Sequence, residues 1–447
     1  MFRDSRSEEE NNESKLGMVG YDLTPRYVQI SYMIGTMEDP ETASTVTGSE
    51  IYNIPLVLCK RPGVNQWSFG RDALKMAEAR GGILVDRLLE RAVLGDMVEL
   101  DGEQYDPVAL LTLFVKRSLS VLGMVMTPDR IGSLMFSVED LNDRMVEILG
   151  RVGANLSLKR ATIHFQSYQE SLYYFMLHQP KELWSQKVLI CNYDGMRLHH
   201  YVMERNVRTT PIVVLMKDAI VETLVLPVKA ELPEGTEASE PDSAQRDNYA
   251  QADLDFYRIM ERVIGEDVFS CVYLLGDGFK ENWMKQSLRF LCRGRKGFKG
   301  NNLLSRGACY SLKDRRDPSE TVKQHVYLGK EKLISNIGIQ VVRRGDPSYF
   351  VLLDAGQNWF DSAKECEFFL PEDGKLEILI TPVDGREPIC ETAILEELPD
   401  RPSQTTRVRL HATMLSVKLL QIRISDLGFG ELYPSTGREW IFEYTIG

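Results

Sequence analysis

Two strand–turn–strand units, far apart in the chain, constrain its fold more than any other feature. In each unit an apolar run leads into a polar turn with an aspartate, and a second apolar run follows. The first is MVGYDLTPRYVQI, with Asp22, and the second is VLICNYDGMRLHHYV, with Asp194. Val28, Ile30 and Tyr32 alternate along the first unit and 188–191 is a short apolar run in the second, so both units are expected to fold as hairpins within sheets. A third turn, in VYLLGDGFKENW, places Gly276 and Gly278 between a strand and a helix.

The segments around these units alternate between strand and helix patterns. Asp106-Pro107 opens a helix over 107–122, because aspartate caps a helix and proline fits its first position. The elements that follow are strand 133–138, helix 139–152, strand 158–165, helix 166–178, strand 187–195, strand 198–204, helix 251–264 and helix 282–291. This alternation predicts an α/β architecture.

The remaining segments predict linkers, loops and a second fold class. Residues 1–15 are polar and are predicted to be a disordered tail, and 229–250 a flexible loop. The charged stretch 313–324 is predicted to be a linker. Beyond it, 325–447 contains only short strand patterns and is predicted to be an all-β sandwich domain.

Composition narrows the function classes. The chain has 447 residues and a formal net charge of −12, which disfavours binding to nucleic acid. We expect no transmembrane helix, because no run of about 18 apolar residues is evident. Seven cysteines lack metal-site spacing and fit a reducing compartment, so we expect a cytoplasmic protein without a membrane partner.

The order of these units resembles the actin and DnaK-type chaperone ATPase superfamily, which has a ribonuclease H-like fold. GYDLTPRYVQI is similar to its first phosphate motif, VLICNYDGMRLHHY to its second, and VYLLGDGFKENW followed by LLSRGACYSL to its adenosine motif. The resemblance implies a two-lobed nucleotide-binding-type domain over 16–312, with lobe I at about 16–185 and lobe II at about 186–312. It implies that 325–447 resembles the chaperone's peptide-binding domain. A bacterial family of unknown function with this plan is suspected.

The resemblance also implies a nucleotide site. Its candidate residues are Asp22, Thr24, Arg26, Asp194, Gly195, Arg197, Gly276, Asp277 and Gly278. Asp22 and Asp194 would hold Mg²⁺, and Arg26 and Arg197 either contact phosphates or serve as surface and lobe-bridging arginines.

The motifs depart from the superfamily's pattern at several positions. Thr24-Pro25-Arg26 stands where the first motif has glycine and threonine, and Tyr193 and Met196 stand near the second motif's glycines. The superfamily's acidic residue falls near 164–166, which has no carboxylate, and its lysine falls near Asp86-Arg87. Phosphoryl transfer needs such groups, so we expect no active ATPase.

Three hypotheses for function follow. The first is a chaperone-like module with a degenerate nucleotide site, no required cofactor, and a protein or peptide held by the C-terminal β-domain. The second is a chaperone-like ATPase that binds ATP and Mg²⁺ through unconventional ligands. The third is an actin-like scaffold or filament protein. Two further features are predicted to have no functional role. His199 is predicted to be a structural or surface histidine, and 293–300 a solvated basic loop.

Overall fold

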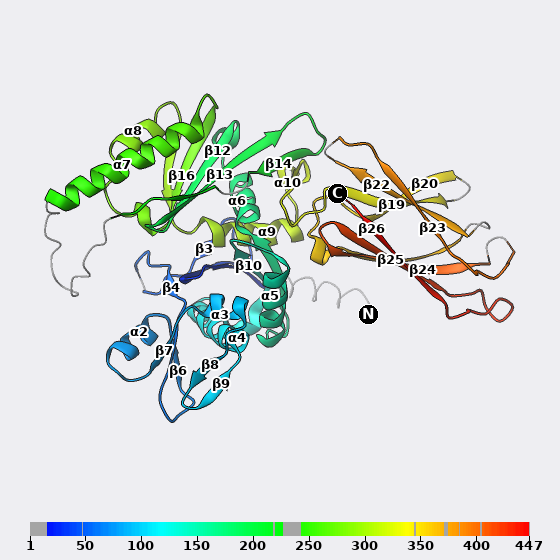
Figure 1. Ribbon diagram of the computed structural model, residues 1–447, viewed down its shortest axis with the longest axis horizontal. Coiled ribbons are helices and arrows are strands. Elements are labelled where there is room, and N and C mark those ends of the chain that lie inside the picture. The colour runs from blue at the N-terminus through cyan, green and yellow to red at the C-terminus, as the bar shows by residue number, and fades with distance from the viewer. Residues whose placement is uncertain are drawn as a thin grey trace. The chain divides into compact units, whose positions relative to one another are not determined.

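The computed structural model describes residues 16–46, 48–217, 220–226, 243–343, 346–370, 374–383, 385–402 and 405–446. The predicted tail at 1–15 and most of the predicted loop at 229–250 lie outside these residues. The chain divides into two compact units, Met1–His325 and Val326–Gly447. The first is a mixed α/β region and the second is a mostly antiparallel β region, as predicted (Figure 1).

The first sheet of the α/β unit has the order β11-β10-β1-β2-β3, and β4 pairs with β2. Strands β1 and β2 form the first predicted hairpin, and β1 runs parallel to β10, which runs parallel to β11. Every residue of β1 is buried, because it is a central strand with a helix packed on it. The strands are β1 Gly17–Leu23, β2 Tyr27–Met33, β3 Glu41–Thr42, β4 Ile54–Pro55, β10 Ile131–Val138 and β11 Thr162–Ser167.

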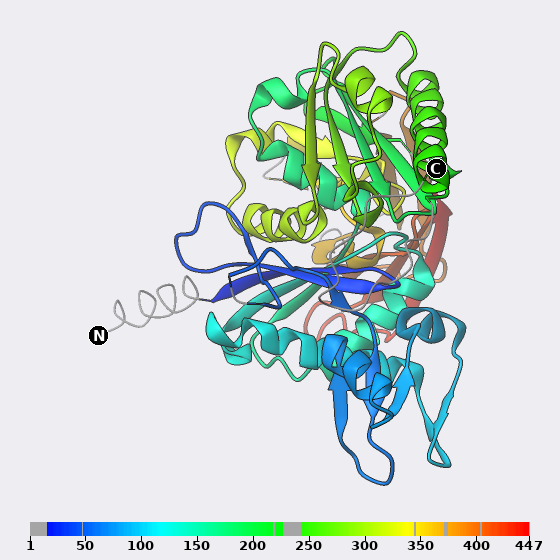
Figure 2. The same ribbon diagram turned by 90° about the vertical axis from the view of Figure 1, so that its left-hand side faces the viewer.

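The second sheet repeats this arrangement in the run β17-β16-β12-β13-β14, and β15 pairs with β13. Strands β12 and β13 form the second predicted hairpin, and β12 runs parallel to β16, which runs parallel to β17. Figure 2 shows the two sheets, blue to cyan below and green above. The strands are β12 Lys187–Tyr193, β13 Arg197–Asn206, β14 Ile212–Met216, β15 Ile220–Thr223, β16 Phe269–Leu275 and β17 Lys296–Gly300.

Helices cover these sheets, and several of them begin at a side-chain cap. Asp106 Oδ1 accepts the Val108 N–H at 3.3 Å, as predicted, and Asn142 Oδ1 accepts the Met145 N–H at 3.0 Å. The helices are α2 Gly70–Glu78, α3 Leu88–Leu94, α4 Pro107–Ser118, α5 Asp143–Asn155, α6 Tyr168–Leu177, α7 Ser243–Ile264, α8 Gln286–Leu291, α9 Leu303–Arg316 and α10 Glu320–Lys323. Short strands between β4 and α4 are β5 Leu58–Lys60, β6 Trp67–Phe69, β7 Ile83–Val85, β8 Val98–Leu100 and β9 Glu103–Tyr105.

Helix α9 follows the second sheet in the chain but packs on β1, β2 and β10 of the first sheet (Figure 2). It also crosses α6 so closely that a Cβ on Gly307 would lie 1.9 Å from the Ser171 carbonyl oxygen. The buried Asp314 accepts a hydrogen bond from His178 at 2.8 Å. The segment after the second sheet therefore ties the two halves of this unit together.

Three sequence predictions need correction. The predicted linker 313–324 is largely helical, because α9 continues to Arg316 with Asp314 buried, and α10 follows. The basic stretch 293–300 was predicted to be a loop, but it contains the edge strand β17. The ring of Phe298 in this strand stacks on the ring of Tyr273, with 4.9 Å between the ring centroids. Helix α7 begins at Ser243, eight residues earlier than predicted.

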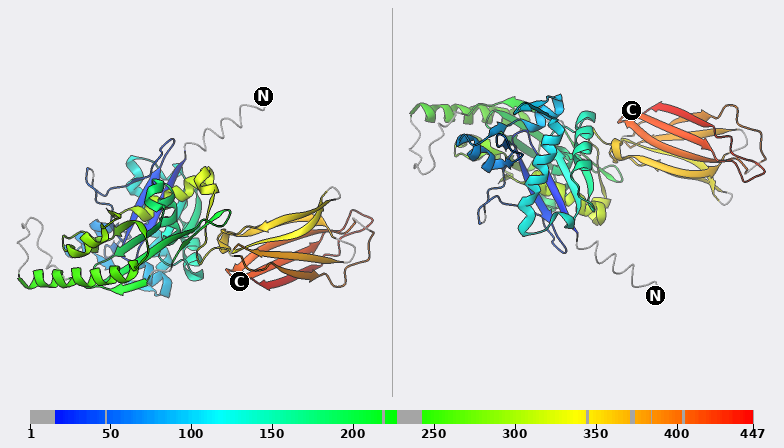
Figure 3. Two further views of the ribbon diagram at one scale, coloured as in Figure 1. Left: turned by 90° about the horizontal axis from the view of Figure 1, so that it is seen from above. Right: turned by 90° about the horizontal axis from the view of Figure 1, so that it is seen from below.

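The C-terminal unit consists of two four-stranded antiparallel sheets, β20-β19-β22-β23 and β21-β24-β25-β26, seen as two layers in Figure 3. Alternate residues of strands from both sheets, such as Leu376 and Leu410, enter one apolar core. The strands are β19 Ser335–Arg343, β20 Asp346–Leu353, β21 Ala363–Phe369, β22 Lys375–Pro382, β23 Ile389–Ile394, β24 Arg407–Ser416, β25 Leu419–Asp426 and β26 Glu439–Thr445. Short β18, His325–Tyr327, lies at the division between the units.

One stretch of the described chain, Pro107–Met124, is long and apolar enough to cross a membrane. It consists of α4 and the 3₁₀ turns after it, and 56% of it is buried inside the α/β unit. A core helix has the same composition and burial, so this stretch is weak evidence for a membrane span.

Candidate functional site

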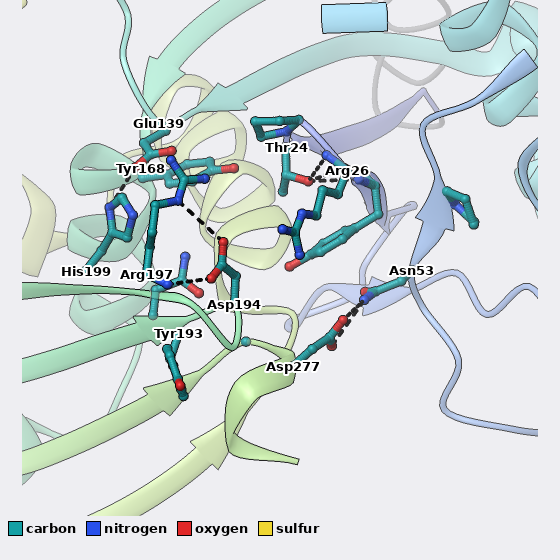
Figure 4. Close-up of a pocket in the computed structure, with 15 residues that line it drawn as sticks. Thr24, Arg26, Asn53, Glu139, Tyr168, Tyr193, Asp194, Arg197, His199 and Asp277 are labelled. Carbon is teal, nitrogen blue, oxygen red and sulfur yellow. Dashed lines mark hydrogen bonds and ion pairs between the residues drawn. The ribbon is translucent and has the colours of Figure 1, made fainter. Parts of the chain in front are cut away.

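Three turns of the α/β unit meet around one cavity of ≈ 280 Å³ (Figure 4). They are the β1–β2 turn, the β12–β13 turn and the turn after β16. Six of the nine predicted site residues line the cavity: Thr24, Arg26, Asp194, Arg197, Gly276 and Asp277. Asp22, Gly195 and Gly278 are not in its lining. The other lining residues are Pro25, Tyr27, Asn53, Pro55, Glu139, Tyr168, Asn192, Tyr193 and His199.

The β12–β13 turn is closed by its own aspartate. Asp194 Oδ1 accepts the backbone N–H of Met196 at 2.8 Å and of Arg197 at 2.7 Å. Gly195 takes the one positive φ in this turn, 97°, which leaves Met196 in an ordinary conformation. Burial alone would raise the pKa of Asp194, but these amides and the charges of Arg26 and Arg197 hold it below the ordinary value. Asp194 is therefore an anion already bound by its own turn.

The β1–β2 turn is closed in the same way by a hydroxyl group. Thr24 Oγ1 accepts the N–H of Arg26 at 3.2 Å and of Tyr27 at 2.9 Å, and it donates to the Tyr27 carbonyl at 2.7 Å. Pro25, which lies between Thr24 and Arg26, has no backbone N–H to donate. Both turns thus use a side chain at their first position to bind the amides two and three residues later.

The glycines of the third turn are needed for packing on Tyr193. A Cβ on Gly276 would lie 2.3 Å from the Tyr193 carbonyl oxygen, and one on Gly278 would lie 2.4 Å from its ring. The Tyr193 hydroxyl donates to the Leu224 carbonyl at 2.6 Å, which fixes the ring in the core. The close approach that these two glycines permit is made here to a buried side chain.

Asp22 lies outside the cavity lining and is only 2% exposed. Its burial raises its pKa to about 7, against a hydrogen bond with Tyr168 that lowers it. Its Oδ1 has no hydrogen-bond partner among the described residues. The two carboxylates predicted to hold Mg²⁺ therefore occupy different surroundings, and the described residues contain no cluster of three His, Cys, Asp or Glu side chains that could hold a metal.

Two contacts across the cavity join residues that sequence analysis did not connect. His199 Nδ1 lies 2.7 Å from Glu139 Oε1, and Asn53 Nδ2 donates to both Asp277 oxygens at 3.3 and 3.4 Å. His199, predicted to be structural or on the surface, lines the cavity. One signal was available: Glu139 directly follows parallel strand β10, at the carboxyl end where α/β sheets place their sites.

The sequence relationships of the chain agree with its division into units. Residues 39–330, more than half of the chain, match the C-terminal part of a family of unknown function, DUF5716. The chain belongs to the DUF5716 family. Residues 332–446 of this DUF5716 chain match a separate domain of unknown function, DUF8552, which falls within the C-terminal unit. No curated protein matches the chain.

Proposed function

We propose that this DUF5716 chain is a non-hydrolysing member of the actin and DnaK-chaperone fold class and serves as a protein-binding or assembly module. The fold assignment is supported by the two sheets of the α/β unit, which share one strand order. Each sheet contains a hairpin whose first strand pairs with a parallel strand, and that strand pairs with a second parallel strand. A cavity between the turns of two such sheets is where this fold class holds nucleotide.

One observation carries the non-hydrolysing part of the proposal: the amides of both hairpin turns are already hydrogen-bonded to Asp194 and Thr24. A phosphate cradle needs backbone N–H groups that are free to bind the anion. Phosphoryl transfer also needs a cation beside the phosphates, commonly a lysine. The described residues that line the cavity include no lysine, and the cations there are Arg26 and Arg197.

The binding part of the proposal rests on the C-terminal unit, which we interpret as a β-sandwich. Its edge strand β20 carries three exposed large side chains in a row, Tyr349, Phe350 and Val351. An edge strand offers unpaired backbone groups to an extended segment of another protein, and exposed apolar side chains add affinity. The partner would be an extended, apolar peptide segment.

A second candidate function, ATP binding with unconventional ligands, has one observation in its favour. Arg26 and Arg197 both line the cavity, and guanidinium groups can bind phosphate in place of backbone amides. The attraction of these two arginines for phosphate is reduced by three carboxylates in the same lining, those of Glu139, Asp194 and Asp277. Bound Mg²⁺ would have to offset that repulsion.

Titration calorimetry with ATP and Mg²⁺ tests the proposal against this alternative. The full chain should give no binding heat at millimolar ATP and release no phosphate above a buffer blank. A dissociation constant below about 100 μM would stabilise the chain by about 1.4 kcal/mol or more at millimolar ATP. Such binding, with phosphate release lost in Arg26→Gln, would replace the proposed function by the second candidate. A labelled extended peptide tests the binding part, because Val351→Lys should weaken its capture and Arg289→Gln should not.

A further inference from the structure

The carboxylates of the cavity lining are all paired within the described structure. Glu139 contacts His199 at 2.7 Å, and Asp277 forms an ion pair with Lys280 at 2.8 Å. Asp194 accepts two backbone N–H groups of its own turn. These acidic groups are therefore compensated before any ligand arrives.

The guanidinium group of Arg26 differs from these carboxylates in its pairing. It lines the cavity from an exposed turn, and it makes no hydrogen bond or ion pair with any side chain in the described part of the chain. Its charge reaches Asp194, whose pKa it helps to lower. Arg197 lies on the other side of Asp194, 3.6 Å away, and its side chain is 56% exposed. Two guanidinium groups thus flank one internal carboxylate (Figure 4).

One part of the cavity wall suits an apolar ligand body. Pro25, Tyr27, Pro55 and Tyr168 contribute rings to the lining. The volume of ≈ 280 Å³ is just below the range of about 300–1,000 Å³ that is typical of pockets for drug-sized ligands. A nucleoside triphosphate carries more negative charge than the two guanidinium groups of the lining can balance, whereas a ligand with a single acidic group needs only one cation.

We propose that the cavity binds a small acid, a carboxylate or phosphate monoester on a flat apolar body, with Arg26 as its principal ligand and Arg197 as the second. The inference rests on the proposed function, in which the turn amides are not available to a phosphate chain. The acid would approach Arg26 from the cavity and form a charge-assisted, bidentate pair with the guanidinium group.

Calorimetry on the full chain tests the inference, with phenyl phosphate, benzoate, inorganic phosphate and ATP with Mg²⁺ as probes. Phenyl phosphate and benzoate are expected to bind more tightly than ATP with Mg²⁺. Arg26→Gln should weaken them at least about tenfold, the effect of losing about 1.4 kcal/mol of a charged hydrogen bond. Arg289→Gln, an exposed arginine on α8, is the matched control and should leave binding unchanged.

The outcomes separate the inference from the proposed function. Absence of phenyl phosphate and benzoate binding at about 10 mM, where a millimolar site would be mostly filled, would overturn the inference alone. Equal binding by wild type and Arg26→Gln would also overturn it. If Arg26→Gln does not fold, protection of Arg26 in the wild-type chain from phenylglyoxal by benzoate decides, and no protection counts against it. Turnover of ATP would overturn the proposed function instead.

Discussion

The carboxylate of Asp194 accepts the backbone N–H of Arg197 at 2.7 Å, within the turn that resembles a phosphate motif. The same oxygen accepts the Met196 N–H at 2.8 Å. In the function that we propose, an oxygen of the protein occupies the donors that a bound phosphate would use. This relationship is the basis for proposing that the chain does not hydrolyse ATP.

Replacing Asp194 should open this turn. In Asp194→Ala the Met196 and Arg197 amides lose their acceptor, which should cost about 1 kcal/mol of stability and increase affinity for inorganic phosphate. Asp194→Asn is the matched control, because it keeps a side-chain oxygen for both amides while removing the charge. Thermal unfolding and phosphate titration measure both effects. A fully stable Asp194→Ala variant with unchanged phosphate affinity would show that the hydrogen bonds are not formed in solution.

Asp22 should make stability fall as pH rises. Its pKa is about 7 in the folded chain against an ordinary 3.8, so the folded state holds the proton more tightly. The stability this gives is fully present below pH 3.8 and is lost as pH rises through 7. The difference corresponds to about 4 kcal/mol as an upper estimate. Unfolding free energies of wild type and Asp22→Asn, measured from pH 4 to pH 9, test this.

In that series the Asp22→Asn variant should lose this part of the pH dependence and be the more stable of the two near pH 8. Parallel stability curves for the two proteins would mean that Asp22 is ionised normally, and its buried position would need another explanation.

The contact between α6 and α9 predicts a large effect from one methyl group. Gly307→Ala would place a Cβ 1.9 Å from the Ser171 carbonyl oxygen, so the helices must move apart at a cost of about 1–3 kcal/mol. Gly150→Ala is the matched control, because Gly150 is an exposed glycine in α5 with open space around it. The control should gain up to about 1 kcal/mol. Equal melting temperatures for the two variants would argue against this helix packing.

The C-terminal unit contains a buried ion pair that should matter for its stability. Arg401 binds both oxygens of Asp426 at 2.7 and 2.9 Å, with side chains only 4% and 0% exposed. Arg401→Met removes the guanidinium charge beside that carboxylate, which keeps hydrogen bonds from Gly428 and Thr436, and should cost about 3 kcal/mol. Arg409→Met breaks an exposed pair with Glu367 and should cost at most about 1 kcal/mol. Hydrogen exchange of the β24 and β25 amides measures the loss of stability in both variants. Similar losses in the two variants would contradict the role given to burial.

The sequence predicted the elements whose determinants are local. The apolar run 188–191 and the Asp106-Pro107 cap each act within a few residues, so the hairpin and helix α4 were predicted. The edge strand β17 was missed, because Lys296 and Lys299 are exposed and the strand is only half-buried, at Phe298 and Gly300. The helical end of α9 was missed, because the charged residue Asp314 is satisfied by the distant His178.

The positions of the candidate site residues could be predicted from local sequence, but their roles could not. Turn positions follow from local sequence, so six residues of the cavity could be named. Their roles depend on atoms elsewhere: Tyr193 fills the space beside Gly276 and Gly278, and Glu139 meets His199. Asp22 was expected in the cleft, but it belongs to a strand buried along its whole length.

Amide hydrogen exchange at Met196 and Arg197, with and without ATP and Mg²⁺, tests the central claim most directly. If Asp194 binds these two N–H groups, they are protected in the free chain, lose that protection in Asp194→Ala, and do not respond to the nucleotide. Rapid exchange in the free wild-type chain that slows when ATP and Mg²⁺ are added would show that the turn is an open phosphate cradle, which would contradict the account.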